Sequence, residues 1–154
     1  MPMIQKAIEP DVAGESRLED LVGYHLRRAS VADMNDFVRC FRAEGLRPIP
    51  FSVLCAIDEQ PGTTSAEICR ILGLQRANIV SILAEFDERG LIERHSDPND
   101  QRIQRLSLSA EAKSLLPGWR ARVVEREEKL FHTLTAGERR TLCELLARVW
   151  KGAE

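Results

Sequence analysis

Residues 64–109 read TSAEICRILGLQRANIVSILAEFDERGLIERHSDPNDQRIQRLSLS, and this stretch decides the fold. Thr64 and Glu67 have the spacing of a capping box, in which each side chain satisfies the other residue's backbone N–H at a helix start. Three apolar residues follow at helical spacing and predict a buried stripe, Ile68, Ile71 and Leu72. Gly73 ends the helix, because glycine adopts the left-handed conformation without steric cost. The pattern therefore predicts one short helix.

A second helix is predicted from about Gln75 to Arg89, with Gly90 after its end and Leu74 entering the core before it. Its inner side consists of Ile79, Ile82, Leu83 and Phe86, and its outer side of Gln75, Arg76, Asn78 and Ser81. Backbone N–H groups at a helix start attract phosphate, and Asn, Gln and Arg side chains pair with base edges in the major groove. A solvated surface helix also has a polar face, so this helix alone leaves both interpretations open.

A β-hairpin follows the second helix. The strand from Leu91 to His95 leads into a tip at Ser96–Arg102, and residues 103–108 return with period-two alternation at Leu106 and Leu108. Two helices and such a hairpin are the parts of a winged helix-turn-helix. The wing tip can lie along a minor groove, whose negative potential attracts an arginine such as Arg102. We expect Asp100 to hold Arg102, and the order of elements favours double-stranded DNA as the partner.

From Leu18 to Trp150 the chain resembles the MarR family of bacterial transcriptional regulators. The resemblance rests on the wing pattern Arg94…Asp100-x-Arg102…Leu106-x-Leu108-Ser109 between two helical regions. It implies a mainly α fold with a small β-wing (α+β), with a winged helix-turn-helix lobe at 46–109 and dimerisation helices at 16–45 and 110–150. Residues 1–15 are expected to form a flexible arm. The predicted DNA contacts are Thr64, Ser65, Gln75, Arg76, Ala77, Asn78, Ser81, Arg94, Asn99, Asp100 and Arg102.

Four positions depart from the pattern of the family. The family often carries Arg or Lys at Ser81, often Ser or Thr at Val80, and usually Thr at Asn78. The operator sequence therefore cannot be transferred from relatives. Arg47 replaces the usual capping Thr before Pro48, which predicts a poorly capped helix start.

The terminal regions are predicted to be helical. Capping boxes at Ser16–Glu19 and Thr135–Glu138 begin helices, the first with a possible break near Ser30, and residues 110–132 form a helix kinked at Pro117-Gly118. Their apolar surface exceeds what a small winged helix needs, which predicts an isologous homodimer, with a monomeric bundle as the alternative. A dimer presents two recognition helices about one DNA turn apart and so predicts a palindromic operator.

The resemblance also implies a small anionic effector, aromatic or an acyl-coenzyme A, bound between the dimerisation helices and the DNA-reading lobe. The candidate residues are Tyr24, His25, Arg28, Arg39, Phe51 and Trp119. A guanidinium binds carboxylates bidentately, although each of these residues taken singly can be structural. We expect the effector to stabilise a lobe spacing that does not fit DNA. Repression relieved by ligand is the default, and activation stays open because the sign depends on where the operator lies.

Composition agrees with one domain of 154 residues. The net charge is −2, and residues 64–109 contain six Arg against seven Asp and Glu. Attraction to DNA must therefore come from the positions of the basic side chains and not from the net charge. No apolar run approaches the ~18 residues that a membrane span needs, and no signal peptide is recognised. We therefore expect a cytoplasmic protein without a membrane partner.

Other classes of function find little support. Cys40, Cys55, Cys69 and Cys143 have neither zinc-site nor disulfide-framework spacing, so no metal and no cofactor is expected. The chain lacks the phosphate-binding, zinc-protease and nucleophile-elbow motifs of common enzymes, which predicts that it is not an enzyme. Two alternatives stay open: a cysteine-based redox-sensing regulator, and a winged helix that binds protein instead of DNA.

Overall fold

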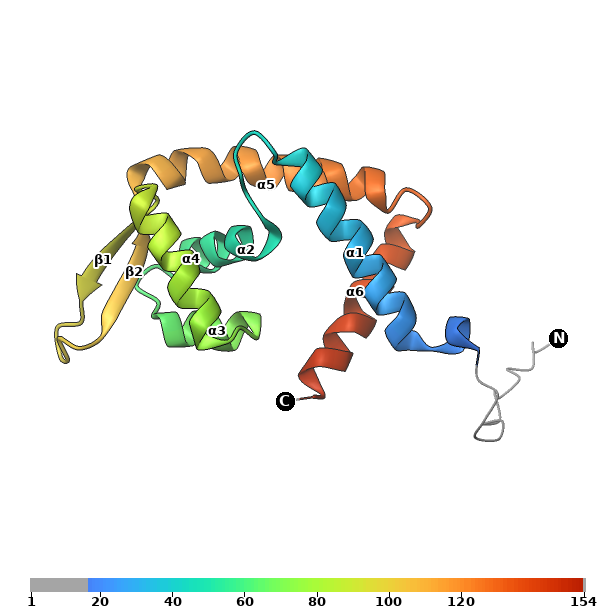
Figure 1. Ribbon diagram of the computed structural model, residues 1–154, viewed down its shortest axis with the longest axis horizontal. Helices are drawn as coiled ribbons and strands as arrows, with labels where there is room; N and C mark the ends of the chain where they lie inside the picture. The colour runs from blue at the N-terminus through green and yellow to red at the C-terminus, as the bar shows by residue number, and fades with distance from the viewer. Residues whose placement is uncertain (1–16, 154) are drawn as a thin grey trace. The chain divides into compact units, whose positions relative to one another are not determined.

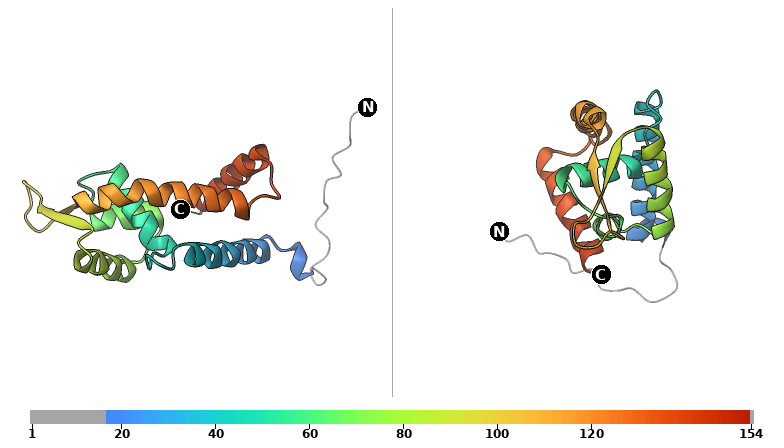
Figure 2. Two further views of the ribbon diagram at one scale, coloured as in Figure 1. Left: turned by 90° about the horizontal axis from the view of Figure 1, so that it is seen from above. Right: turned by 90° about the vertical axis from the view of Figure 1, so that its left-hand side faces the viewer.

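A computed structural model describes residues 17–153, drawn in Figures 1 and 2. In chain order the elements are a 3-10 turn (Leu18–Asp20), α1 (Val22–Cys40), α2 (Pro48–Glu59), α3 (Ser65–Leu72), α4 (Arg76–Glu88), β1 (Ile92–Ser96), β2 (Gln104–Leu108), α5 (Ala110–Leu130) and α6 (Ala136–Lys151). This order confirms the mainly helical fold with a small wing. The described chain divides within α1, between Asp33 and Met34, into two compact units. The expected arm and Ser16 lie outside the described residues.

The helix-turn-helix forms as the capping signals predict. Thr64 is the N-cap of α3, where its N–H donates to Glu67 (2.7 Å) and its hydroxyl accepts from the Glu67 N–H (3.3 Å). Gly73 follows α3 with a left-handed φ of 64°, and Gln75 is the N-cap of α4. One detail of the prediction is wrong, because Ile71 is 43% exposed. A helix turns by about 100° per residue, so Ile71 lies on the flank of the stripe that Ile68 and Leu72 define.

The wing is the antiparallel pair β1 and β2, in register from Ile92 opposite Leu108 to Ser96 opposite Gln104. Its base is buried, and Figure 1 shows its tip extending away from the helices of the lobe. Thr63 adds an isolated bridge to Leu106: the Leu106 N–H donates to the Thr63 carbonyl at 2.8 Å. This bridge joins the segment before α3 to the wing.

One apolar core supports the helix-turn-helix and the wing together. It draws on every element of the second unit except α6: Phe37, Phe41, Val53, Leu54, Ile57, Ile68, Ile79, Ile82, Leu83, Phe86, Leu91, Ile92, Leu106, Leu108, Ala112, Leu116 and Trp119 are among its members. The four residues predicted for the inner side of α4 are all buried here. Because α4 and the wing share this core, the lobe holds its recognition helix and hairpin in one fixed arrangement.

The terminal helices differ from the prediction in their limits. α1 continues through Ser30 without a break and ends at Cys40, before Gly45. Relative to alanine, an exposed serine destabilises a helix by only about 0.5 kcal/mol, so it does not interrupt α1. α5 runs unbroken through Pro117 to Leu130. The capping box of α6 at Thr135 is confirmed.

Both terminal helices carry exposed apolar side chains. On the 3-10 turn and α1 these include Leu18, Leu21, Val22, Leu26, Val31, Met34 and Val38, and on α6 Leu142, Leu145, Leu146, Val149 and Trp150. Such a run along a helix exceeds the scattered exposure that is normal on protein surfaces. None of the helices within residues 17–153 has the length and apolar character that a membrane crossing requires.

Candidate nucleic-acid interface

The N-terminal half of α4 is polar and solvent-exposed. Gln75, Arg76, Ala77, Asn78 and Ser81 are all exposed, as the sequence predicts. Gln75 caps the helix without a side-chain hydrogen bond to its first turn. Because the first N–H groups of a helix have no intrahelical acceptor, they can donate to a phosphate here.

Two of the three acidic residues further along α4, Glu85 and Asp87, are neutralised by arginines of the same unit. Glu85 accepts from Arg47 (2.6 Å) and Arg89 (3.3 Å), and Asp87 pairs with Arg94 at 2.8 Å. Arg94, a predicted DNA contact, is therefore engaged with Asp87, an ion pair that the sequence did not reveal. The Arg47 side chain makes no capping hydrogen bond to α2, as predicted, and forms its ion pair with Glu85 of α4 instead. Two of the three carboxylates of α4 are thus compensated locally, and Glu88 is exposed at the end of the helix.

Arg76 and Arg102 contrast with these paired arginines. Both are exposed, and within residues 17–153 neither guanidinium has a carboxylate partner. The expected contact from Asp100 does form, but its Oδ1 accepts from the backbone N–H of Arg102 (3.0 Å) and leaves the guanidinium free to reach outward. Two uncompensated cations, one on α4 and one at the wing tip, are what an anionic polymer requires.

The wing tip is organised by Asp97, which is 6% exposed. Its Oδ1 accepts from the N–H groups of Asn99 (2.8 Å) and Asp100 (3.1 Å), and its Oδ2 from Arg105 Nε (2.5 Å). The Asn99 N–H and the Arg105 guanidinium hold the pKa of Asp97 below its ordinary value of 3.8. Arg105 also donates to the Gly62 carbonyl (2.8 Å). The ionised Asp97 thus fixes the tip, and Arg105 ties it to the segment before α3.

Sequence reasoning missed Asp97 and Arg105. The Asp-Pro-Asn run was a usable signal for Asp97, because Asp side chains commonly accept hydrogen bonds from backbone N–H groups two residues on. Arg105 offered no such signal, since its contact depends on the strand register.

The two predicted contacts at the start of α3 are placed differently from each other. The Thr64 hydroxyl is engaged with Glu67, and the N–H and hydroxyl of Thr64 lower the pKa of Glu67. Ser65 is exposed beside it. Of this pair, Ser65 has the hydroxyl available to a ligand. Asn99 is likewise exposed at the wing tip.

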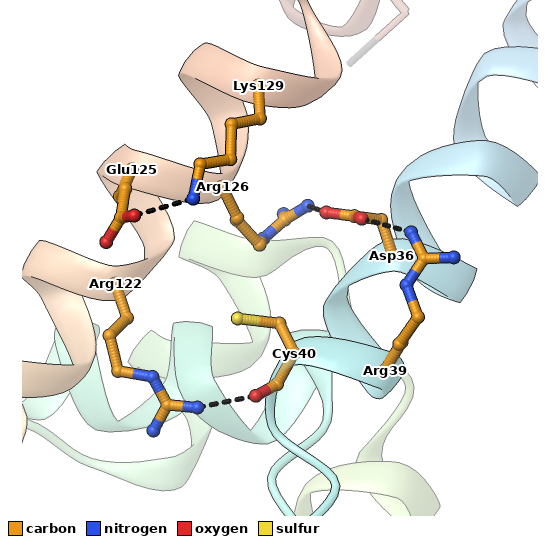
Figure 3. A pocket seen from close by; sticks show the side chains of 7 residues that line it. All are labelled: Asp36, Arg39, Cys40, Arg122, Glu125, Arg126 and Lys129. Atoms are coloured by element: carbon orange, nitrogen blue, oxygen red, sulfur yellow. Dashed lines mark hydrogen bonds and ion pairs between the residues drawn. The ribbon is translucent and has the colours of Figure 1, made fainter.

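A second candidate site is a cavity of about 220 Å³ between the end of α1 and α5 (Figure 3). Its lining is charged and consists of Asp36, Arg39, Cys40, Arg122, Glu125, Arg126 and Lys129. Asp36 accepts from both Arg39 (2.6 Å) and Arg126 (3.2 Å), which lowers its pKa against the opposing effect of burial. Lys129 pairs with Glu125 at 2.6 Å. Four cations face two carboxylates, so the lining carries a net positive charge.

Two of these arginines are fixed by aromatic rings beneath them. The guanidinium carbon of Arg122 lies 4.4 Å from the centre of the Phe41 ring, and that of Arg126 lies 4.9 Å from the Phe37 ring. Arg122 also pairs with Glu44 and donates to the Cys40 carbonyl, and Arg126 is only 7% exposed. Cations held over aromatic faces are preorganised for an anion. Sequence reasoning missed Arg122, Arg126 and Lys129, although their spacing places them on one helix face and was a usable signal.

The predicted effector residues fall in both units. Arg39 lines the cavity, whereas Phe51 packs against Phe37 (ring centres 5.7 Å apart) and Trp119 is buried in the core. In the first unit, the Tyr24 ring meets His25 edge-on at 5.1 Å, and His25 Nε2 hydrogen-bonds the Glu19 carbonyl (2.8 Å). Arg28 is exposed on the same helix. Arg39 is thus the one predicted effector residue in the lining of the cavity.

Known proteins resemble this chain over most of its length. The sequence model described as MarR family matches residues 44–103. A putative transcriptional regulatory protein for the hcr operon of Thauera aromatica is 27% identical over 149 residues, 96% of this chain and 86% of that protein. A probable transcriptional regulator from Pseudomonas aeruginosa is 31% identical, with a TM-score of 0.80 over 86% of this chain and 99% of that chain.

The transcriptional repressor CouR bound to a 23-mer DNA duplex is 33% identical, with a TM-score of 0.81 over 88% of this chain and 99% of that chain. CouR bound to p-coumaroyl-CoA gives 31% identity and a TM-score of 0.78 over 90% of this chain and 97% of that chain. These similarities extend over both the DNA-reading lobe and the helices that flank it.

Proposed function

Because the chain belongs to the MarR family of transcriptional regulators, we propose that it binds a palindromic operator as a homodimer and releases it on binding a small anionic effector. In this proposal α4 enters the major groove and the wing tip lies along the adjacent minor groove. The family confirms the prediction of a DNA-binding regulator rather than an enzyme. Operator, dimer, effector and repressor role are the proposal.

The proposed DNA contacts rest on one observation: some arginines of the lobe are paired with carboxylates and others are not. Arginines of the lobe neutralise Glu85 and Asp87, while Arg76 and Arg102 have no such partner in the described chain. A solvated surface helix gains nothing from an unpaired cation at its N-terminal end, where the helix dipole is itself positive. Cations left unpaired on the start of α4 and on the wing tip suit the phosphates that border the major groove and the adjacent minor groove.

The homodimer is supported by the apolar faces of α1 and α6. Leu142, Leu145 and Val149 lie on α6 at spacings of three and four residues and are exposed. A symmetric pairing would bury such a stripe against its copy or against α1 of the partner. Two α4 helices would then contact half-sites about 34–36 Å apart.

A fluorescence-anisotropy titration tests the proposal. Purified protein is titrated against duplexes that tile the region upstream of its own coding sequence, at two salt concentrations. We expect nanomolar binding to one palindromic segment, weakened steeply by salt. The titration is repeated with a duplex pool of random sequence. Equal, weak binding to all tiles and to this pool would contradict a sequence-specific regulator and favour a protein-binding winged helix.

Asn78 and Arg102 are expected to contribute in different ways. Asn78→Ala should change the preference among base pairs, because an amide on α4 can pair bidentately with adenine. Arg102→Ala should weaken binding to every duplex to a similar degree, because the wing arginine is attracted by the electrostatic potential of the DNA and makes no hydrogen bond to a base edge. Competition with single-base-pair variants of the operator measures both effects. An unchanged preference in Asn78→Ala would refute its assignment as a base contact.

The effector site is proposed at the cavity of Asp36, Arg39, Arg122, Arg126 and Lys129. About 220 Å³ is less than the ~300–1,000 Å³ of pockets that enclose drug-sized ligands, so the cavity suits the anionic group of a larger molecule. CouR, 31% identical, binds the thioester p-coumaroyl-CoA. Binding would favour the dimer conformation with the greater affinity for ligand and the lower affinity for DNA.

Release of DNA by candidate effectors tests this site. p-Coumarate, benzoate, coenzyme A and p-coumaroyl-CoA are each added to the complex with labelled operator. Arg39→Gln should raise the effector concentration needed for half-maximal release of DNA by about tenfold. This is the loss of affinity expected when one charge-assisted hydrogen bond is removed. Arg140→Gln, which removes an exposed cation from α6, is the matched control. Identical release curves for both variants would exclude Arg39 from the site.

Cysteine-based sensing is the alternative that one observation favours. The Cys40 thiol lines the cationic cavity and points toward α5 (Figure 3). Cys55 is less suited, because burial raises its pKa to about 11 and the thiolate is the reactive form. Loss of operator binding in hydrogen peroxide, prevented by Cys40→Ser, would establish this alternative.

A further inference from the structure

Val80 is an exposed apolar residue on the recognition helix. It lies one turn after Arg76 on α4, and 66% of its surface is accessible to solvent. Residues three and four positions apart are neighbours on a helix, which gives Val80 the neighbours Arg76, Ala77, Leu83 and Ala84. All of these except Leu83 are exposed. Val80 therefore sits on the polar face that the proposed function directs at DNA.

Stability of the fold does not explain a valine at this position. A side chain that is two-thirds exposed gains little burial energy, and β-branched residues form helices less readily than alanine. Single exposed apolar residues are common on protein surfaces, so exposure alone is not informative. What distinguishes Val80 is its position, within one turn of Arg76 and next to Ser81, on a stretch of α4 without a carboxylate.

We propose that Val80 recognises the C5-methyl group of a thymine in the major groove. This inference rests on the proposed placement of α4. The thymine methyl is the apolar group on the major-groove edges of the four bases, and an apolar side chain contacts it favourably. The other three bases would leave the valine against polar atoms or water. Because valine is stiff at χ1, little side-chain entropy is lost on contact.

The test removes the thymine methyl groups one at a time from the DNA and both γ-methyl groups of Val80 from the protein. The probe is the tightest duplex selected by the protein from a random-sequence library, with each thymine replaced in turn by uracil, which lacks only the methyl. Uracil at one symmetric pair of positions should weaken binding by about fourfold per half-site, the effect of exposing one buried methyl group. Val80→Ala should bind the thymine and uracil duplexes equally.

Controls separate this contact from other effects. Ile71→Ala removes a larger exposed apolar side chain from α3, and its sensitivity to uracil should equal that of the unaltered protein. Val80→Ala should keep or raise the melting temperature, since alanine favours helix. Val80→Ser also removes both methyl groups and serves if the alanine variant does not fold.

The outcomes distinguish this inference from the proposed function. If no duplex is enriched above the random pool, sequence-specific binding itself is refuted. If a duplex is bound specifically but every uracil has the same effect on the unaltered protein and on Val80→Ala, only the thymine contact is overturned. A uracil effect that disappears in Val80→Ala at one symmetric pair of positions supports it.

Discussion

Replacing Arg76 and Arg102 together by alanine should weaken operator binding by about a hundredfold or more and flatten its dependence on salt. A dimer would lose four guanidiniums, none of which has a carboxylate partner in the described chain. If each neutralises one phosphate, the slope of log K against log salt should fall by about three to four. Anisotropy titrations at several salt concentrations measure both quantities.

The matched control is the pair Arg140→Ala and Arg148→Ala. It removes the same charge from exposed positions of α6, outside the lobe. We expect it to change binding little, because screening limits the reach of exposed charges to about 10 Å in 0.1 M salt. Full retention of DNA binding by the Arg76/Arg102 variant would refute both groove assignments.

Phe86→Ala should lower the free energy of unfolding by about 3–5 kcal/mol, the usual cost of deleting a buried aromatic ring. Phe86 is fully buried on α4, in the core beside Ile82 and Leu83, and its carbonyl accepts from the Leu91 N–H (2.9 Å) at the start of the wing. A small domain is stable by about 5–15 kcal/mol, so the variant should retain little reserve. Urea denaturation followed by circular dichroism measures the change.

Phe86→Leu is the graded control for this prediction. It keeps most of the apolar volume and should cost less than the alanine variant. DNA binding should fall in proportion to the unfolded fraction in both. A melting curve for Phe86→Ala that matches the unaltered protein would mean that α4 is not anchored by this ring.

Local signals in the sequence were sufficient for the helix-turn-helix. The capping box of Thr64 and Glu67 and the left-handed Gly73 each act within a few residues, so their effect does not depend on the rest of the fold. Burial of Ile71 was predicted wrongly for the converse reason. How wide a stripe a helix buries depends on its neighbours, and α3 packs through Ile68.

Long-range pairs could not be predicted in this way. Asp36 and Arg126 are 90 positions apart, and only the packing of α1 on α5 brings them together. The same holds for Arg105 and the Gly62 carbonyl, which are 43 positions apart. The spacing of residues 122, 126 and 129 places them on one helix face, but it carries no information about what faces them.

The hydrogen bond from Arg105 to Gly62 has a consequence for the DNA. It couples the wing to the chain entering α3, and together with the core that α3, α4 and the wing share it resists separate displacement of the hairpin and α4. In an operator complex, the number of base pairs between the major-groove and minor-groove contacts of one subunit would be set by the protein. New operators could then arise by exchanging bases, whereas inserting a base pair between the two contacts would cost one of them.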